Sequence, residues 1–384
     1  MTAIFMVWNT TGFALAADDA ISVQSPDENG KERTLWTDTG EKIFMPENHK
    51  IAIATAADMK INNIQVSNIL AGWNMQLKKD LSNLNDYVIN FLNYLSKCEF
   101  PLNFQYQNDL KIRCELIMNT FSDSYKDDPE NIESRISELI NDWTNSEPKN
   151  VFGPDFQSEF LADGLEHEGY DDLYLDFCIN WAKSKAADFQ NENQIEVVKE
   201  LITQTFMATF GIELDVKQKW HKSLQVQLIP YLINYIDSEN YAKLLFVGYG
   251  KDDWIPHLVK VSIHPNLNGA PRARILQVAN PLKIWFSYLA QTDQVDMFLQ
   301  GYSNDYREAV LSFVPEESKD GALEHLGSLE EKRFSEMRKK VNNLSLSKLE
   351  FVARSFVEME SLGSFLVEYL PSVGGNIKVV SMTR

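Results

Sequence analysis

The chain has 384 residues, of which 44% are apolar and 11% aromatic, so it can bury a substantial core and is not an intrinsically disordered protein. Its 36 basic and 55 acidic residues give a net charge of −19, which argues against nucleic acid and anionic membranes as partners, because both require a basic surface. No apolar run approaches the ~20 residues that cross a bilayer, so no membrane span is expected.

The three cysteines, Cys98, Cys114 and Cys178, are unclustered and none belongs to a CxxC pair. Neither a disulfide framework nor a thiolate metal site is therefore indicated, and a reducing, cytoplasmic compartment is expected.

The first twenty residues predict a β-hairpin. Thr2–Trp8 and Phe13–Ala17 are its arms, and the turn-forming residues Asn9–Gly12 lie between them. Both arms are apolar at nearly every position, so we expect the hairpin to be covered on both faces. The stretch also imitates a signal peptide, but the first basic residue is Lys31, and a signal peptide needs a positively charged beginning.

Three zones follow along the chain. Short strands are predicted at Lys42–Phe44 and Ile51–Thr55, and residues from about 62 to 240 are predicted to be helical. Strands return from about 241. The expected helices lie around Ile64–Leu70, Tyr87–Leu95, Asp128–Ile140, Ile195–Phe210 and Ser347–Phe365, and the expected later strands are Lys243–Val247, Leu258–Ile263, Arg272–Gln277 and Ile377–Ser381.

Acidic residues are concentrated in the helical middle zone. Residues 121–176 hold 16 acidic and 3 basic residues, a local net charge of −13. A solvated outer face is the favoured interpretation, and a surface for a basic protein partner is the alternative. The six histidines form no pair at metal-ligand spacing, and the usual nucleotide-binding and hydrolase motifs are missing, so no metal or organic cofactor is expected.

The hairpin places two acidic residues near Thr2. If its turn is centred at Thr10 and Thr11, the antiparallel partner of residue 2 is Asp18 or Asp19. Thr2 is small enough for Met1 to be removed, which would leave a hydroxyl nucleophile beside its own base, an α-amine with a pKa of about 8. On the hairpin alone, an ordinary strand-end threonine remains the favoured interpretation.

The two ends of the chain resemble a known family. Met1–Ile4 followed by Gly12–Asp18 is similar to the opening of a proteasome β-type subunit, an N-terminal nucleophile (Ntn) hydrolase, including the spacing from threonine to acid. Gly40–Phe44 resembles the family's lysine strand, after about eight extra residues within Ser25–Leu35. Ile51–Asp58 resembles the strand that contains the oxyanion glycine, here Ala54, and ends in Gly-Asp, here Ala57-Asp58.

The later part of the chain adds to this resemblance. Leu244–Gly250 with Pro256–Leu258 is similar to a strand, a Gly-Tyr turn and the following strand of the family, and Ser372–Gly375 resembles its entry to the last strand. The family's auxiliary acid corresponds to Tyr369. The likeness extends to bacterial proteasome-like proteins with an enlarged helical middle.

The resemblance implies an α+β fold, a four-layer αββα Ntn-hydrolase sandwich formed by residues 1–80 and 241–384, with a large helical insertion at 81–240. It also implies a threonine-type hydrolase of amide bonds whose substrate is a peptide or protein. Thr2 would be the nucleophile, Lys42 would lower its pKa and Asp18 would orient Lys42. The N–H near Ala54 would meet the oxyanion, and Ser372 would position the amine.

A second interpretation comes from a different class of protein. The chain would be a catalytically inactive proteasome-like scaffold that binds a protein partner through its acidic helical insertion. The changes at Ala54 and Tyr369 motivate this alternative, and the joint presence of Thr2, Asp18 and Lys42 weighs against it. Assembly into a homo-oligomer is left open by both.

Overall fold

The computed structural model describes residues 2–26, 32–37, 40–57, 59–98, 100, 111–112, 114–116, 118–119, 199–200, 202–205, 241–264, 271–290, 292–302, 304–367 and 373–384. Within these ranges the protein is a mixed α+β fold, as expected, with two larger antiparallel sheets and two small ones. None of the helices described in these ranges is long and apolar enough to cross a membrane.

The predicted N-terminal hairpin forms the middle of a four-stranded sheet. Its arms are β1 (Ala3–Asn9) and β2 (Gly12–Asp18), and every residue of both arms is buried, which confirms the expectation of two covered faces. β12 (Phe286–Ala290) pairs with β1, and β13 (Ile377–Thr383) pairs with β2, both antiparallel. The first and last strands of the chain therefore belong to one sheet.

The second sheet has five antiparallel strands in the order β11-β10-β9-β6-β5. All five were predicted, and their ends differ from the expected bounds by no more than a few residues. Their bounds are β5 (Ile43–Phe44), β6 (Ile51–Ala57), β9 (Ala242–Gly248), β10 (His257–His264) and β11 (Arg272–Ala279).

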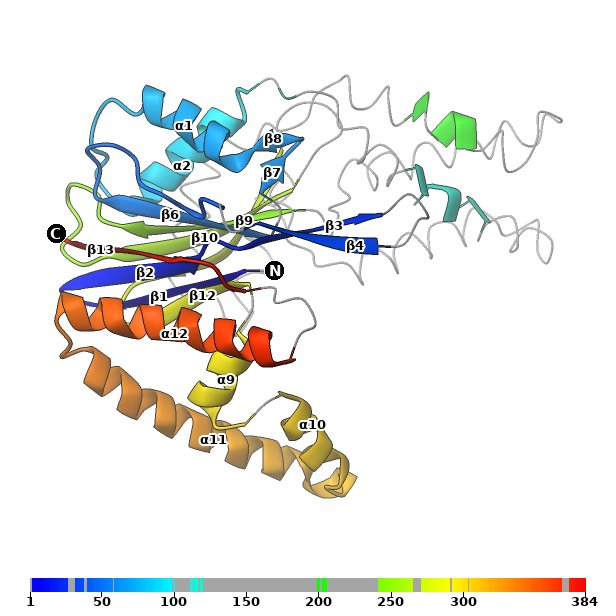
Figure 1. Ribbon diagram of the computed structural model, residues 1–384, viewed down its shortest axis with the longest axis vertical. Coiled ribbons are helices and arrows are strands. Elements are labelled where there is room, and N and C mark those ends of the chain that lie inside the picture. The colour runs from blue at the N-terminus through cyan, green and yellow to red at the C-terminus, as the bar shows by residue number, and fades with distance from the viewer. Residues whose placement is uncertain are drawn as a thin grey trace, which may run out of the picture.

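Two short hairpins complete the strands of the described residues. β3 (Ile21–Pro26) pairs with β4 (Glu32–Thr37), so the extra stretch that we noted between residues 25 and 35 falls within this hairpin. In Figure 1 it projects beyond the end of the two larger sheets at which the N-terminus lies. The second hairpin joins β7 (Lys60–Ile61) to β8 (Ile64–Gln65).

Helices cover the outer faces of both larger sheets, which stack on each other (Figure 1). α1 (Val66–Gln76) and α2 (Leu84–Leu95) pack on the five-stranded sheet. On the four-stranded sheet lie α9 (Asp293–Gln300), α11 (Glu316–Val341) and α12 (Leu346–Val367), and α10 (Asn304–Ser312) lies between α9 and α11 in the chain. The described residues thus form four layers: helix, sheet, sheet and helix.

The hairpin is apolar throughout because its alternating side chains fill two different cores. Ile4, Met6 and Trp8 point into the space between the two sheets, where they pack with alanines of β6 and with Leu245 and Val247 of β9. Phe5 and Val7 point the other way, toward α9 and α12. A strand that is buried on both faces loses the polar alternation of a surface strand.

The boundary of the helical insertion at residue 81 stays a prediction. α2, which follows this boundary, packs in the same core as α1 and β9, through buried side chains such as Tyr87, Phe91 and Leu92. The predicted helices at 128–140 and 195–210 lie outside the described residues or only touch them, at 199–200 and 202–205.

The turn of the hairpin is tied to the helical layer by one side chain. Asn9 is fully buried, and its Nδ2 donates to the carbonyl of Val341, the last residue of α11, at 3.1 Å and to that of Leu344 at 2.9 Å. Its Oδ1 accepts from the N–H and the hydroxyl of Thr11. Asn9 thus ties the hairpin turn to the end of α11, where the Val341 carbonyl also accepts the Leu344 N–H at 3.0 Å.

We expect Asn9→Ala to lower the free energy of unfolding by about 2–3 kcal/mol, because a fully buried side chain loses its hydrogen bonds to Val341, Leu344 and Thr11. Chemical denaturation measures this change. Thr10→Ala is the matched control: Thr10 is exposed in the same turn, so it should change stability by less than about 0.5 kcal/mol. Equal effects of the two variants would contradict the assignment.

Candidate active site

The carboxylate of Asp18 joins three parts of the chain at the end of β2. Its Oδ1 accepts hydrogen bonds from the Thr2 hydroxyl at 3.0 Å, the Ala3 N–H at 2.9 Å and Lys42 Nζ at 2.8 Å. Its Oδ2 accepts from the N–H of Gly374 at 3.3 Å. Three of the predicted site residues, Thr2, Asp18 and Lys42, therefore meet at a single carboxylate.

Strand register explains this meeting. Ile4 pairs with Ala17, so the same register continued to the strand ends puts Thr2 opposite Asp19 and Ala3 opposite Asp18, as the hairpin predicted. β13 pairs Ile377 with Asp18, which brings the turn at Gly374 to the second carboxylate oxygen.

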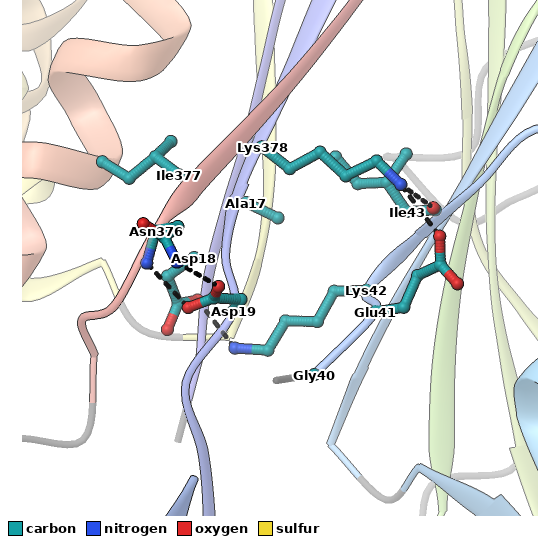
Figure 2. Close-up of a pocket in the computed structure, with 10 residues that line it drawn as sticks. All are labelled: Ala17, Asp18, Asp19, Gly40, Glu41, Lys42, Ile43, Asn376, Ile377 and Lys378. Atoms are coloured by element: carbon teal, nitrogen blue, oxygen red, sulfur yellow. Dashed lines mark hydrogen bonds and ion pairs between the residues drawn. The ribbon is translucent and has the colours of Figure 1, made fainter. Parts of the chain in front are cut away.

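Lys42 comes from the other sheet. It immediately precedes β5, and its carbonyl accepts the N–H of Thr55 in β6 at 2.9 Å, which fixes its backbone. From there its side chain crosses to Asp18 (Figure 2).

Lys42 and Asp18 form a buried ion pair. Only 3% of Lys42 and 1% of Asp18 are exposed. Burial lowers the pKa of Lys42 below its ordinary value, and the charge of Asp18 and the hydrogen bond to it oppose this shift, with a smaller contribution from Asp19. A buried charge of this kind is tolerated only because its partner lies at hydrogen-bond distance.

Asp19 has a different role from Asp18, which settles the choice that the hairpin left open. Its Oδ1 and Oδ2 accept from the backbone N–H and the side-chain amide of Asn376, at 2.8 and 3.1 Å. Its own N–H donates to the Asn376 carbonyl, and its carbonyl accepts the N–H of Gly40. Asp19 thus fixes the segment before β13, and Asp18 contacts Thr2.

A cavity of about 460 Å³ opens beside the ion pair, between the edges of the two sheets. Asp18 and Lys42 form part of its wall (Figure 2). A second lysine, Lys378 of β13, extends across it in the opposite direction, with Nζ 2.9 Å from the Glu41 carboxylate and 3.2 Å from the Ile43 carbonyl. The two lysines therefore cross the gap between the sheets from opposite sides.

Ala54 is buried inside β6, opposite Ile43 on one side and Leu245 on the other. The direction of its N–H follows from two hydrogen bonds on either side of it. The Thr55 N–H donates to the Lys42 carbonyl, next to β5, and the Lys50 carbonyl accepts the N–H of Tyr249, which follows β9. Because successive residues of a strand direct their N–H groups to opposite sides, the Ala54 N–H points at β9 within the sheet and away from Lys42. We therefore assign it no part in binding an oxyanion. Ser372 and Tyr369 lie outside the described residues.

The end of β6 has a backbone conformation that favours glycine. Ala57 has φ +64°, in the left-handed region, where a residue with a Cβ is strained. We matched this position to the glycine of the family's Gly-Asp pair. The backbone at this position thus has the conformation that glycine adopts most easily, although the residue is alanine.

Sequence reasoning missed two contacts of the site. It did not predict that the Thr2 hydroxyl and Lys42 share one oxygen of Asp18, nor that the Gly374 N–H binds the other oxygen. The second contact could have been inferred from the Ser372–Gly375 motif, if the following strand had been paired with β2 so that Ile377 lies opposite Asp18. Among the described residues, no group of three metal-ligating side chains occurs.

Neither a protein-family model, nor a curated protein, nor a solved structure matches this chain. The chemistry of the site therefore has to be argued from its geometry. A hydroxyl, a carboxylate and an ammonium group lie in one buried network that borders a cavity, an arrangement in which a cation can lower the pKa of a nucleophile.

We expect strong energetic coupling between Asp18 and Lys42. Asp18→Asn or Lys42→Met alone should cost about 3–5 kcal/mol, because each leaves a buried group without its partner. The double variant should cost less than the sum, with a coupling energy of about 1.5–3 kcal/mol from denaturant unfolding.

The exposed pair Glu41–Lys378 is the matched control, since its atoms are 2.9 Å apart, close to the 2.8 Å of the buried pair, but its side chains are 67% and 48% exposed. Its coupling energy, from Glu41→Gln and Lys378→Met, should be about 0.5 kcal/mol. Equal coupling in the two pairs would contradict the buried-pair description.

Proposed function

We propose that this protein is a threonine-type Ntn hydrolase of amide bonds, with a peptide or protein as substrate. The observation that carries the proposal is the convergence of Thr2, Asp18 and Lys42 at one carboxylate beside a cavity. The layered arrangement of helix, sheet, sheet and helix supports the finer description of the fold as an αββα Ntn sandwich with a helical insertion.

Thr2 supplies both the nucleophile and the base in this proposal, once Met1 is removed. The α-amine takes the proton of the hydroxyl as Oγ1 attacks the scissile carbonyl carbon, and it then passes this proton to the leaving amine. The resulting ester between Thr2 and the acyl group is cleaved by water, which the same amine deprotonates. The free hydroxyl and the free amine are thereby restored.

Lys42 and Asp18 prepare the nucleophile in this proposal. Lys42 Nζ and the Thr2 hydroxyl bind the same oxygen of Asp18, so the cation lies one bridging atom away from the hydroxyl. A nearby positive charge favours the deprotonated forms of the hydroxyl and the amine. Burial lowers the pKa of Lys42, and the charge of Asp18 and the hydrogen bond to it keep that pKa from falling further.

The first test follows covalent labelling of the N-terminus by an epoxyketone or β-lactone. Purified wild-type protein should have the mass expected without Met1, and Thr2 should carry the label. Thr2→Ser should keep part of the labelling because it keeps a hydroxyl, and Thr2→Ala should lose it entirely. The free energy of unfolding of both variants should lie within about 1 kcal/mol of the wild-type value, because Thr2 is a small residue at the end of a strand. Retention of Met1, or labelling of Thr2→Ala, would refute the proposal.

The second test concerns the charge at position 42. Lys42→Met should abolish labelling, because the buried cation disappears. Lys42→Arg should not restore it, because the planar guanidinium differs from an ammonium in size and direction of its donors. Lys378→Met removes the other lysine of the cavity and should leave the rate of labelling unchanged within about twofold. Labelling of Lys42→Met at the wild-type rate would remove the lysine from the mechanism.

Two observations favour a catalytically inactive scaffold as the second candidate. The Ala54 N–H is directed into the sheet, and only 6% of Thr2 is exposed. In that case Thr2 would serve only as a donor to Asp18, and the acidic segment 121–176 would bind a basic protein partner. Wild-type protein that has lost Met1 and is never labelled would favour the scaffold.

A further inference from the structure

A second cavity lies at the opposite edge of the stacked sheets, where β12 ends the four-stranded sheet. It measures about 500 Å³ and is bounded by β10, β11, β12 and α11. Its walls combine aromatic rings, among them Tyr288 and Phe334, with the side chains of Lys260 and Arg338. Neither the proposed hydrolase site nor the scaffold interpretation uses these residues.

The charges around this cavity are the reverse of the protein's overall charge. Lys260, Lys283 and Arg338 line it, against the single acidic residue Glu331, although the chain as a whole has a net charge of −19. In the described part of the chain, no carboxylate forms an ion pair with Lys260 or Arg338. Lys260 and Arg338, which have no carboxylate partner among the described residues, therefore attract an anion to this concave surface.

Lys260 is the most constrained of these cations. It lies on β10 in a half-buried position, with Nζ 5.1 Å from the centre of the Tyr288 ring. Burial, with a smaller contribution from the like charge of Lys243 on β9, lowers the pKa of Lys260 to about 8. The ammonium is therefore a poorly compensated charge at neutral pH, and a bound anion would compensate it.

We propose that this cavity binds a small aromatic carboxylate, with the carboxylate at Lys260 and Arg338 and the ring against Tyr288 and Phe334. Arg338 offers the planar pair of donors that matches a carboxylate. The aromatic lining favours an organic monoanion over phosphate, because a doubly charged, strongly hydrated ion loses more solvation on entering such a cavity. The proposal does not depend on the function of Thr2.

Titration calorimetry with 1-naphthoate tests the proposal, and 1-naphthamide is the uncharged control of the same shape. Naphthoate should bind saturably, and naphthamide about tenfold more weakly or not at all. Lys260→Gln should weaken naphthoate binding about tenfold or more. Lys340→Gln removes the same charge from an exposed position of α11 outside the cavity and should bind as wild type does.

The pH dependence gives a second readout. Affinity should fall as the pH rises above about 8, because the Lys260 ammonium loses its proton. The other charged or titratable groups that face it are Lys243 on β9, Tyr288 on β12, and Lys283, Glu331 and Arg338 around the cavity. Of these, Tyr288 has a raised pKa because it is buried and stays neutral in this range.

Lys260→Arg should keep the affinity and lose the decline above pH 8, since a guanidinium keeps its charge there. Three results would each overturn the proposal: no naphthoate binding, equal binding of naphthamide and naphthoate, or wild-type affinity in a folded Lys260→Gln variant.

Discussion

The carboxylate of Asp18 is the contact on which the two ends of the chain and the two sheets depend. Its two oxygens receive donors from the start of β1, from the residue before β5 and from the turn before β13. These segments are far apart in the sequence. One negative charge in a buried position therefore organises the region where Thr2 lies, and each donor helps to offset the cost of burying that charge.

The local part of this site could be predicted from the sequence. A continuous apolar arm, a polar turn and a second apolar arm fix an antiparallel register, and that register alone brought residue 2 next to residues 18 and 19. The choice between the two acidic residues could not be made in this way. It depends on the segment before β13, where Asn376 donates two hydrogen bonds to the carboxylate of Asp19. The carboxylate of Asp18 is the one that accepts the Thr2 hydroxyl.

The contacts between layers could not be derived from local patterns. The meeting of Lys42 with Asp18 depends on how one sheet stacks on the other, and only the family resemblance pointed to it. β12 was missed because five residues that include a serine and a tyrosine give a weak strand signal, and α11 because most of its side chains are exposed. The helical pattern of α2 was predicted, but an apolar helix face does not reveal which sheet it covers.

The two lysines that cross between the sheets form ion pairs that should respond differently to ionic strength. The exposed pair with Glu41 lies in solvent, where counter-ions weaken its attraction, and the buried pair with Asp18 is shielded from them. High salt would thus weaken the outer ion pair and leave the inner one almost unchanged. The hydrogen bond from Lys378 to the Ile43 carbonyl, which involves no second charge, would then be the main contact of Lys378 with β5.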